Sequence, residues 1–336
     1  MSVTLVGGHI TLLFTIEKDG RLLRNQGSRG AGFNVEHGVR ANVNLLNTSK
    51  EEQVFSAGSS LDEKLIVEEG EIKVKIFDLN GQEILDSSKI YFDLVDELRH
   101  AKLLEKGDSY SIEVNIDLPT SQGFGMSAAG LVAVAYAFRE LTGIGLMGQY
   151  LRLCHRIERL NGSGLGDVLG ISAGGVELRI QSGAPGAAGR ALGFGCPQQI
   201  LLAWQPSEKR HTSKYIDDPE WESKITLAGQ NAVHNLKQKP WNHSQWGELL
   251  TQSRIFAEQS DLLDEPERKQ LLSIAREVVR DLDLQAKVSI RLCMLGISLA
   301  ILPRELSKPI KKAELELISK SLEEKKIGTK ITRISG

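Results

Sequence analysis

The chain reads Pro119-Thr120-Ser121-Gln122-Gly123-Phe124-Gly125-Met126-Ser127-Ala128-Ala129 about a third of the way along its length. Just before this run, residues 113–118 alternate polar and apolar side chains, which predicts a strand that ends at the proline. Just after it, apolar residues recur at helical spacing over 127–141, and Gly143 stands where a helix C-cap is expected. The sequence therefore predicts a strand, a glycine loop and a helix in succession.

Such a loop is suited to hold a phosphate group. The first turn of a helix leaves backbone N–H groups unpaired and carries the positive end of the helix dipole. Gly123 and Gly125 have no Cβ atom, so an anion can approach the backbone closely. Ser127 adds a hydroxyl at the start of the helix, able to bind a phosphate or a magnesium ion. The alternative is a plain glycine turn in which Ser127 serves only as the N-cap.

Two other nucleotide motifs compete for the same loop. It is not a Walker A loop, because no Gly-Lys-Ser/Thr closes it, but Gly123, Gly125 and Ala128 satisfy the loose form of the dinucleotide fingerprint. A dinucleotide fold requires a strand soon after the helix, whereas the next periodic segment, residues 146–160, is helical. The sequence therefore favours phosphate binding of another kind.

Acidic residues that follow the loop are candidates for metal binding and proton transfer. His155 and Glu158 lie three positions apart on the second predicted helix, so they share a face, away from much of its apolar stripe. Asp167 follows in a glycine-dense loop, residues 162–167. Two carboxylates with different neighbours can take different roles, one holding a metal and one contacting a reacting hydroxyl.

Each of these residues also has an ordinary structural interpretation. A histidine and glutamate on a polar helix face are typical of a solvated surface, and a turn aspartate often caps its own backbone. The run 27–32, Gly-Ser-Arg-Gly-Ala-Gly, reads as a turn, and Arg179 could project from a strand into solvent. Spacing alone does not choose between these interpretations and a functional one.

Composition limits the classes of function. The chain has 336 residues, 41% hydrophobic and 25% charged, which is enough for two domains with a sizeable core. A net charge of -2 without a basic block indicates neither nucleic acid nor membrane partners. The longest apolar runs, 128–138 and 292–302, are too short to span a bilayer, and the first residues do not resemble a secretory signal. Three widely separated cysteines indicate no disulfide framework or zinc site, so we expect a cytoplasmic protein.

The rest of the chain predicts an α+β protein. Residues 3–43 read as short strands separated by glycine turns, and residues 64–85 as a strand and hairpin. The Gly-, Ala- and Pro-rich segment 181–197 is the best candidate for a domain boundary. Beyond it we expect a strand near 199–204, helices within 222–281 and a strand near 295–302.

The run Pro119–Ala129 resembles the second conserved motif of the GHMP kinases, Pro-x-x-x-Gly-Leu/Phe-Gly-x-Ser-Ala-Ala. Within that superfamily, further motifs resemble, in order and spacing, the archaeal pantoate kinases: Gly8–Thr11, Gly27–Gly32, His155-x-x-Glu158, Gly164–Val168, Gly174–Arg179 and Gly183–Gly186. The resemblance is dense up to residue 186 and thin afterwards, where Met294-Leu295-Gly296 looks like the remnant of a C-terminal glycine motif. Two departures are Gly7, which replaces a usual proline, and residues 289–298, which lack the usual glycine-rich run.

This resemblance implies a two-domain GHMP kinase fold of the α+β class. An N-terminal nucleotide-binding domain would span residues 1–185 and a C-terminal ferredoxin-like domain 186–336, with ATP and substrate in the cleft between them. By matching position, it implies ATP binding at Pro119, Gly123, Phe124, Gly125, Met126, Ser127 and Ala128. Ser127 and Glu158 would hold magnesium (Mg2+), Asp167 would face the substrate hydroxyl, and Ser28, His155 and Arg179 would hold the substrate.

The activity that the resemblance implies is ATP-dependent phosphorylation of (R)-pantoate to (R)-4-phosphopantoate, a step of coenzyme A biosynthesis in archaea. A cationic Arg179 suits the carboxylate of pantoate, and phosphoryl transfer requires mainly positioning and charge neutralisation. The alternatives are a kinase for another small alcohol, such as mevalonate, homoserine or a sugar, and a non-catalytic ATP-binding regulator. The sequence does not reveal the oligomeric state, although metabolic kinases of this size are commonly homodimers.

Overall fold

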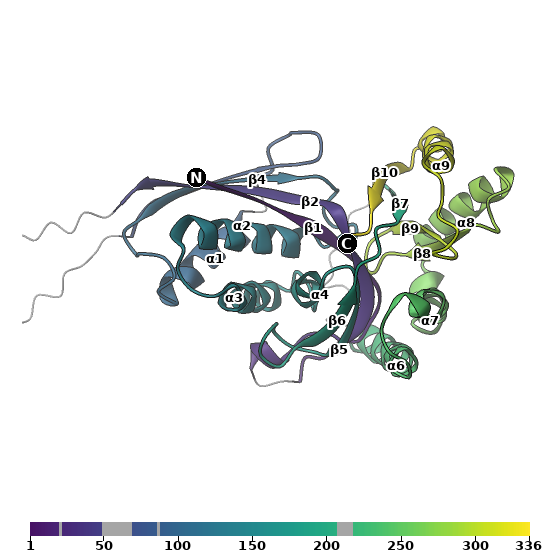
Figure 1. Cartoon of the computed structure of the whole chain (residues 1–336), viewed down its shortest axis with the longest axis horizontal. Helices are drawn as coiled ribbons and strands as arrows, with labels where there is room; N and C mark the ends of the chain where they lie inside the picture. Colours follow the sequence, from purple (N-terminus) through teal and green to yellow (C-terminus); the bar gives the residue numbers. More distant parts are fainter. Residues whose placement is uncertain (20–21, 49–68, 86–87, 207–217) are drawn as a thin grey trace, which may run out of the picture.

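The computed structural model describes residues 1–19, 22–48, 69–85, 88–206 and 218–336. Figure 1 shows two sheets along the length of the molecule, each with its own helices. The first sheet has the order β3-β4-β2-β5-β6, with β1 paired to β2, and the second has the order β10-β7-β9-β8. β3 and β4 are parallel, and the other neighbours in both sheets are antiparallel.

The elements of the first half are β1 (Ser2–Phe14), β2 (Gly30–Asn47), β3 (Ile72–Phe77), α1 (Lys89–His100), β4 (Ser109–Ile116), α2 (Met126–Thr142), α3 (Met147–Leu160), α4 (Asp167–Ala173), β5 (Val176–Gln181) and β6 (Arg190–Phe194). The elements of the second half are β7 (Gln199–Trp204), α6 (Pro219–Leu236), α7 (Trp246–Gln259), α8 (Pro266–Asp281), β8 (Val288–Leu292), β9 (Ser298–Pro303), α9 (Lys312–Glu324) and β10 (Gly328–Arg333). Short 3-10 turns occupy Leu23–Asn25, His243–Gln245 and Leu262–Asp264.

The central strand, glycine loop and helix agree with the sequence prediction. β4 ends at Ile116, and α2 runs from Met126 to Thr142. Gly143 ends the helix with a left-handed φ of 69° and donates its N–H to the carbonyl of Arg139. The residues of α2 are themselves small or apolar on almost all sides of the helix, which lets it lie buried against β1 and β2.

The prediction of short strands over residues 3–43 is wrong. β1 and β2 are two long strands paired antiparallel along most of their length. Several glycines that read as turns lie inside these strands, where they permit close approach of the partner backbone. A Cβ atom on Gly32, for example, would lie 2.0 Å from the carbonyl oxygen of Ile10.

Other local predictions are confirmed in part. Strand β3 and a tight turn at Asp78–Gln82 match the expected hairpin region, although residues 64–68 of that prediction lie outside the described residues. The strand expected near 295–302 begins only at Ser298, because residues 293–297 form a loop. The helix α4 was not predicted, nor were β6, β8, α9 and β10.

The predicted domain boundary at 185/186 stays a prediction. β6 lies beyond it in the sequence but pairs with β5 in the first sheet. The second sheet begins with β7 at Gln199. The chain also returns at its C-terminus to the middle of the molecule, as Figure 1 shows, where the N–H of Ser335 donates to the carbonyl of Asn34 in β2.

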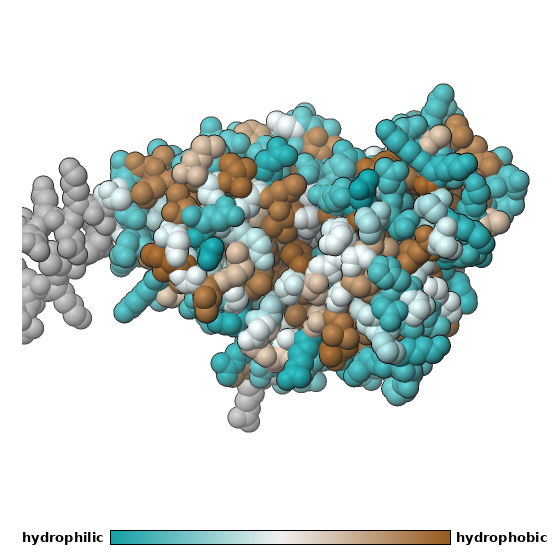
Figure 2. Space-filling model, viewed as in Figure 1, coloured by the Kyte–Doolittle hydropathy of each residue, from teal (hydrophilic) through white to brown (hydrophobic). Residues whose placement is uncertain are grey.

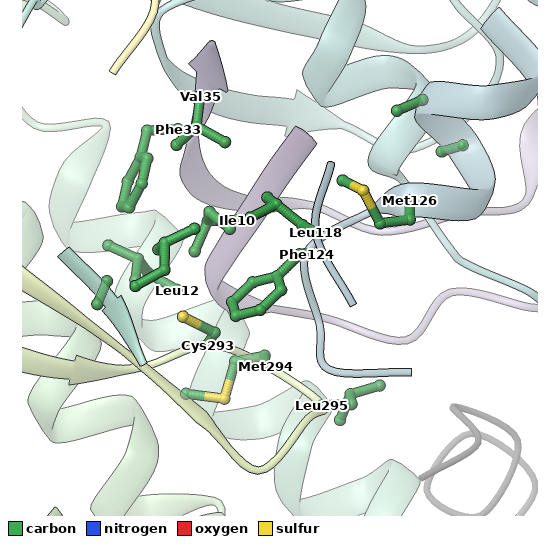
Figure 3. Close-up of a cluster of buried hydrophobic side chains, with 14 of the residues drawn as sticks. Ile10, Leu12, Phe33, Val35, Leu118, Phe124, Met126, Cys293, Met294 and Leu295 are labelled. Carbon is green, nitrogen blue, oxygen red and sulfur yellow. The ribbon is translucent and has the colours of Figure 1, made fainter. Parts of the chain in front are cut away.

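One apolar cluster joins the two halves around the glycine loop (Figure 3). Phe124 of the loop lies between Ile10 and Leu12 of β1 and Cys293 and Met294 of the second half, and Met126 at the start of α2 lies on the far side of Leu118. The amide of Met294 donates to the carbonyl of Thr11, and the Ser298 hydroxyl donates to the carbonyl of Gln122 at 2.5 Å. The loop is therefore held from both sides by buried contacts.

The surface is mostly hydrophilic over the C-terminal helices (Figure 2). Figure 2 shows hydrophilic side chains over the C-terminal helices at the right and a strip of apolar residues near the middle of the view. Among the described helices, none has the length and apolar character needed to cross a bilayer.

Candidate active site

A single cavity of about 260 Å³ brings most of the predicted site residues together. Its walls come from the glycine loop, the start of α2, the loop 161–166, the first residue of α4, β1, β5 and the 294–295 loop. Of the predicted residues, those that line it are Ser28, Pro119, Gly123, Phe124, Gly125, Met126, Ser127, Ala128, Asp167 and Arg179. His155 and Glu158 do not line it, and Glu158 lies behind the loop 161–166 and the start of α4.

The glycine loop has the geometry expected of an anion site. Gly123 and Gly125 both adopt left-handed φ values, 74° and 69°, which favour glycine. The N-cap of α2 is Gly125, and within the described part of the chain no side chain caps this end. Ser127 is the second residue of the helix and is exposed. The interpretation of Ser127 as the N-cap is therefore wrong, and the first-turn amides remain available to a ligand.

Glu158 and His155 are buried, contrary to the surface interpretation of the pair. Glu158 is 1% exposed, and its Oε1 accepts hydrogen bonds from the amides of Asp167 at 3.1 Å and Val168 at 3.4 Å. Glu158 thereby accepts hydrogen bonds from two of the backbone amides that the first turn of α4 leaves without a partner inside the helix. Burial and the neighbouring carboxylate of Asp167 raise the pKa of Glu158 above its usual range.

His155 contacts backbone rather than solvent. Its Nε2 lies 3.1 Å from the carbonyl of Gln26 and 3.3 Å from that of Leu23, and its Nδ1 lies 3.7 Å from Glu158 Oε2. Burial lowers the pKa of His155 to about 4, so it is neutral near pH 7. It therefore supports the segment that leads to Ser28.

Asp167 is the first residue of α4 and not part of a loop, which corrects the sequence prediction. Its side chain is 23% exposed, and its Oδ1 lies 2.7 Å from His9 Nδ1. Burial acts to raise the pKa of Asp167, but the hydrogen bond and charge of His9 and the charge of Arg179 outweigh burial and hold that pKa below its usual range. Asp167 is therefore an ionised carboxylate at the cavity wall.

Arg179 does not project into solvent, because it is 1% exposed. Its two terminal nitrogens donate to Ser28 Oγ at 3.1 Å and Thr11 Oγ1 at 3.3 Å, and its Nε lies 3.4 Å from Glu177 Oε1. A planar guanidinium at a cavity wall, backed by hydroxyls, is suited to bind a carboxylate.

Sequence reasoning missed three residues of this site, His9, Thr11 and Glu177. His9 and Glu177 are both fully buried, and Thr11 is nearly so. The only available signal was indirect, since His9 and Thr11 fall in one of the motifs noted above and Glu177 in another. Their partners are more than 150 positions away in the sequence, so no local spacing reveals the contacts.

Two of the predicted residues, Ser127 and Glu158, carry oxygen atoms of the kind that magnesium binds. Glu158 Oε2 is buried with no hydrogen-bond partner among the described residues, and Ser127 lines the cavity, which Glu158 itself does not line. No group of three or more His, Cys, Asp or Glu side chains in the described part of the chain could form a metal cage. Magnesium commonly uses one or two protein oxygens together with phosphates and waters, and a hydroxyl and a carboxylate are ligands of that kind.

The chain is similar in sequence to known kinases. The GHMP kinases N terminal domain matches residues 93–175. The pantoate kinase of Thermococcus kodakarensis is 27% identical over 306 residues, which cover 89% of this chain and 87% of the relative. The pantoate kinase of Methanospirillum hungatei is 28% identical over 277 residues, 80% of this chain and 79% of the relative.

Among solved structures, a phosphotransferase related to the CoA biosynthesis pathway aligns with a TM-score of 0.72 at 24% identity, over 99% of this chain and 95% of that chain. The resemblance to GHMP kinases and the α+β fold class predicted from the sequence are therefore confirmed.

Proposed function

We propose that this chain, a GHMP kinase by its N-terminal domain, uses ATP to phosphorylate the terminal hydroxyl of pantoate. The observation that carries the proposal is that the glycine loop, Asp167 and Arg179 open into one cavity. The similarity to archaeal pantoate kinases over most of the chain supports pantoate as the acceptor.

In this proposal the triphosphate of ATP lies on the first-turn amides of α2, with the Ser127 hydroxyl beside it. Ser127 and Glu158 would hold magnesium, which when bound neutralises part of the phosphate charge. Burial makes the ionised form of Glu158 costly, so a cation beside its unpartnered oxygen would offset that cost.

Pantoate carries a carboxylate at one end and a primary hydroxyl at the other. Its carboxylate would bind the Arg179 guanidinium and Ser28, supported from behind by His155. Its terminal hydroxyl would then face Asp167, which orients the oxygen for attack on the γ-phosphorus. The new O–P bond forms as the bond to the leaving ADP breaks, and the hydroxyl proton passes late to Asp167.

This reaction would take place in the cytoplasm, as the composition suggests. The three cysteines are free and buried, which suits a reducing compartment. The expectation of a homodimer stays a prediction.

A panel of acceptors at equal concentration tests the proposal by ADP release. We expect release that requires pantoate and stops when EDTA removes magnesium, with little release for mevalonate, homoserine or galactose. Faster turnover of mevalonate or another alcohol would overturn the choice of acceptor. ATP binding by calorimetry without turnover of any acceptor would favour the regulator instead.

The glycine loop offers a test with a matched control. In Gly123→Ala, the new Cβ would lie 2.7 Å from the carbonyl oxygen of Met294, whereas Gly143→Ala, at a similar φ, meets nothing within 4 Å. Both variants should lose about 1–2 kcal/mol of stability through left-handed strain, and Gly123→Ala should lose more because of the contact with Met294. Only Gly123→Ala should raise the KM for ATP, by about tenfold or more, because displaced amides no longer meet the phosphates. Equal KM values for ATP in the two variants would contradict phosphate binding at this loop.

A further inference from the structure

His9 lies in the middle of β1, fully buried between two carboxylates. Its Nδ1 is 2.7 Å from Asp167 Oδ1, and its Nε2 is 3.0 Å from Glu177 Oε1. Asp167 comes from α4 and Glu177 from β5, so the imidazole joins three elements. Neither the phosphate loop nor the substrate groups considered above require a histidine at this position.

The surroundings of His9 favour its cationic form. Burial alone acts to lower the pKa of His9, but the hydrogen bonds and charges of Asp167 and Glu177 outweigh it and raise that pKa above its usual range. Arg179 lies against the same oxygen of Glu177, and Glu158 lies behind Asp167. As an imidazolium, His9 donates one N–H to each carboxylate.

The imidazole is also fixed in space by backbone. A Cβ atom on Gly170 of α4 would lie 2.3 Å from His9 Nε2, so only glycine leaves room for the ring. The backbone N–H of His9 donates to the carbonyl of Phe124 in the glycine loop at 3.1 Å. One residue therefore contacts the glycine loop through its backbone and Asp167 through its side chain.

We propose that His9 is a positioning residue that orients Asp167 for phosphoryl transfer, an inference that rests on the proposed function. The Nδ1–H of His9 holds Oδ1 of Asp167 and leaves Oδ2 for the acceptor hydroxyl. Oδ2 lies beside Gly164, in the loop that forms one wall of the cavity, since a Cβ atom on Gly164 would be 2.8 Å from Oδ2 and 2.6 Å from Glu158 Oε1. The same residue fixes the distance between that oxygen and the loop that carries the triphosphate.

Two neutral substitutions separate this role from a merely structural one. The side-chain amide of asparagine places its N–H near the position of Nδ1, and that of glutamine near Nε2. His9→Asn should therefore keep the contact to Asp167, and His9→Gln only the contact to Glu177. We expect His9→Gln to lower kcat by about 100-fold and His9→Asn by less than about tenfold. The KM values for ATP and pantoate should change less than about threefold in both variants.

The control variant is His100→Gln. His100 is exposed, and its Nδ1 lies 2.8 Å from the carbonyl of Asp96, so we expect this substitution to leave the kinetics unchanged. Higher kcat in His9→Gln than in His9→Asn would overturn the proposal, because the contact to Glu177 would then matter more. The proposal would also be overturned if the substitutions at His9 mainly raised the KM values and left kcat nearly unchanged.

A measurement on the wild-type protein covers the case in which the variants do not fold. Nitrogen-15 NMR of the histidine rings reports which ring nitrogens carry protons. We expect both nitrogens of His9 to be protonated at pH 7, and a spectrum in which Nδ1 carries no proton would overturn the proposal. This readout does not depend on turnover, so it remains decisive even if pantoate is the wrong acceptor.

Discussion

Replacement of Asp167 by asparagine is expected to lower kcat by about 1,000-fold, within the range for loss of a group that handles the reacting proton. The amide keeps the shape of the side chain but cannot accept the hydroxyl proton and carries no negative charge. Binding of ATP should change little, because the first-turn amides of α2 hold the triphosphate in this account. Steady-state kinetics with pantoate and calorimetry with ATP measure the two effects.

The matched control is Asp281→Asn on α8, where the carboxylate is 62% exposed and pairs only loosely with Arg280, at 3.9 Å. It should have wild-type kinetics. Activity of Asp167→Asn within a few fold of wild type would contradict the proposed role of this residue.

Replacement of Arg179 by glutamine is expected to raise the KM for pantoate by about 100-fold, since charge-assisted hydrogen bonds contribute roughly 1.5–3 kcal/mol. The KM for ATP should change far less, because Arg179 lies on the β5 side of the cavity. Arg179→Lys keeps the charge and loses the planar fork, so it should fall between wild type and glutamine. Initial rates over a range of pantoate concentrations measure the effect.

Arg254→Gln provides the control, because this arginine is 49% exposed and pairs with Glu258 on the surface of α7. Thermal unfolding of Arg179→Gln should accompany the kinetics, since the substitution also removes a partner of the buried Glu177. An unchanged KM for pantoate in a folded Arg179→Gln protein would exclude this arginine as the carboxylate site.

Local sequence signals were sufficient for the strand, glycine loop and helix at the centre of the first half. The strand, loop and helix around residues 119–129 are encoded by alternation, two glycines and a run of helix-forming residues, all within about 30 positions. α4 was missed because it is short, begins after a glycine and contains Gly170. Its first turn is satisfied by Glu158 from the preceding helix, a contact that no local signal reveals.

The glycines of β1 and β2 misled the prediction for a different physical reason. They read as turns because glycine permits turns, but here they allow two long strands to pack closely. Whether a glycine serves a turn or a close approach depends on what lies across from it, and that is a property of the tertiary structure.

Most of the predicted site residues line the cavity, but the sequence did not predict the contacts that join them. Helical spacing placed His155 and Glu158 on one face of α3 and away from its apolar stripe, which suggested solvent. That face is instead covered by the turn at Leu23–Asn25 and by α4. The pairing of His9 with Asp167 and Glu177 spans three segments far apart in the sequence, so only the folded chain reveals it.

The central claim is that pantoate lies with its carboxylate on Arg179 and its terminal hydroxyl between Asp167 and the triphosphate. The position of the new phosphate in the product tests this most directly, by phosphorus–proton correlation NMR on the reaction of the wild-type enzyme with ATP and pantoate. The account predicts a phosphorus signal coupled to the two protons of the terminal CH2 group. Coupling to the proton beside the carboxylate, or no phosphorylated product, would contradict it.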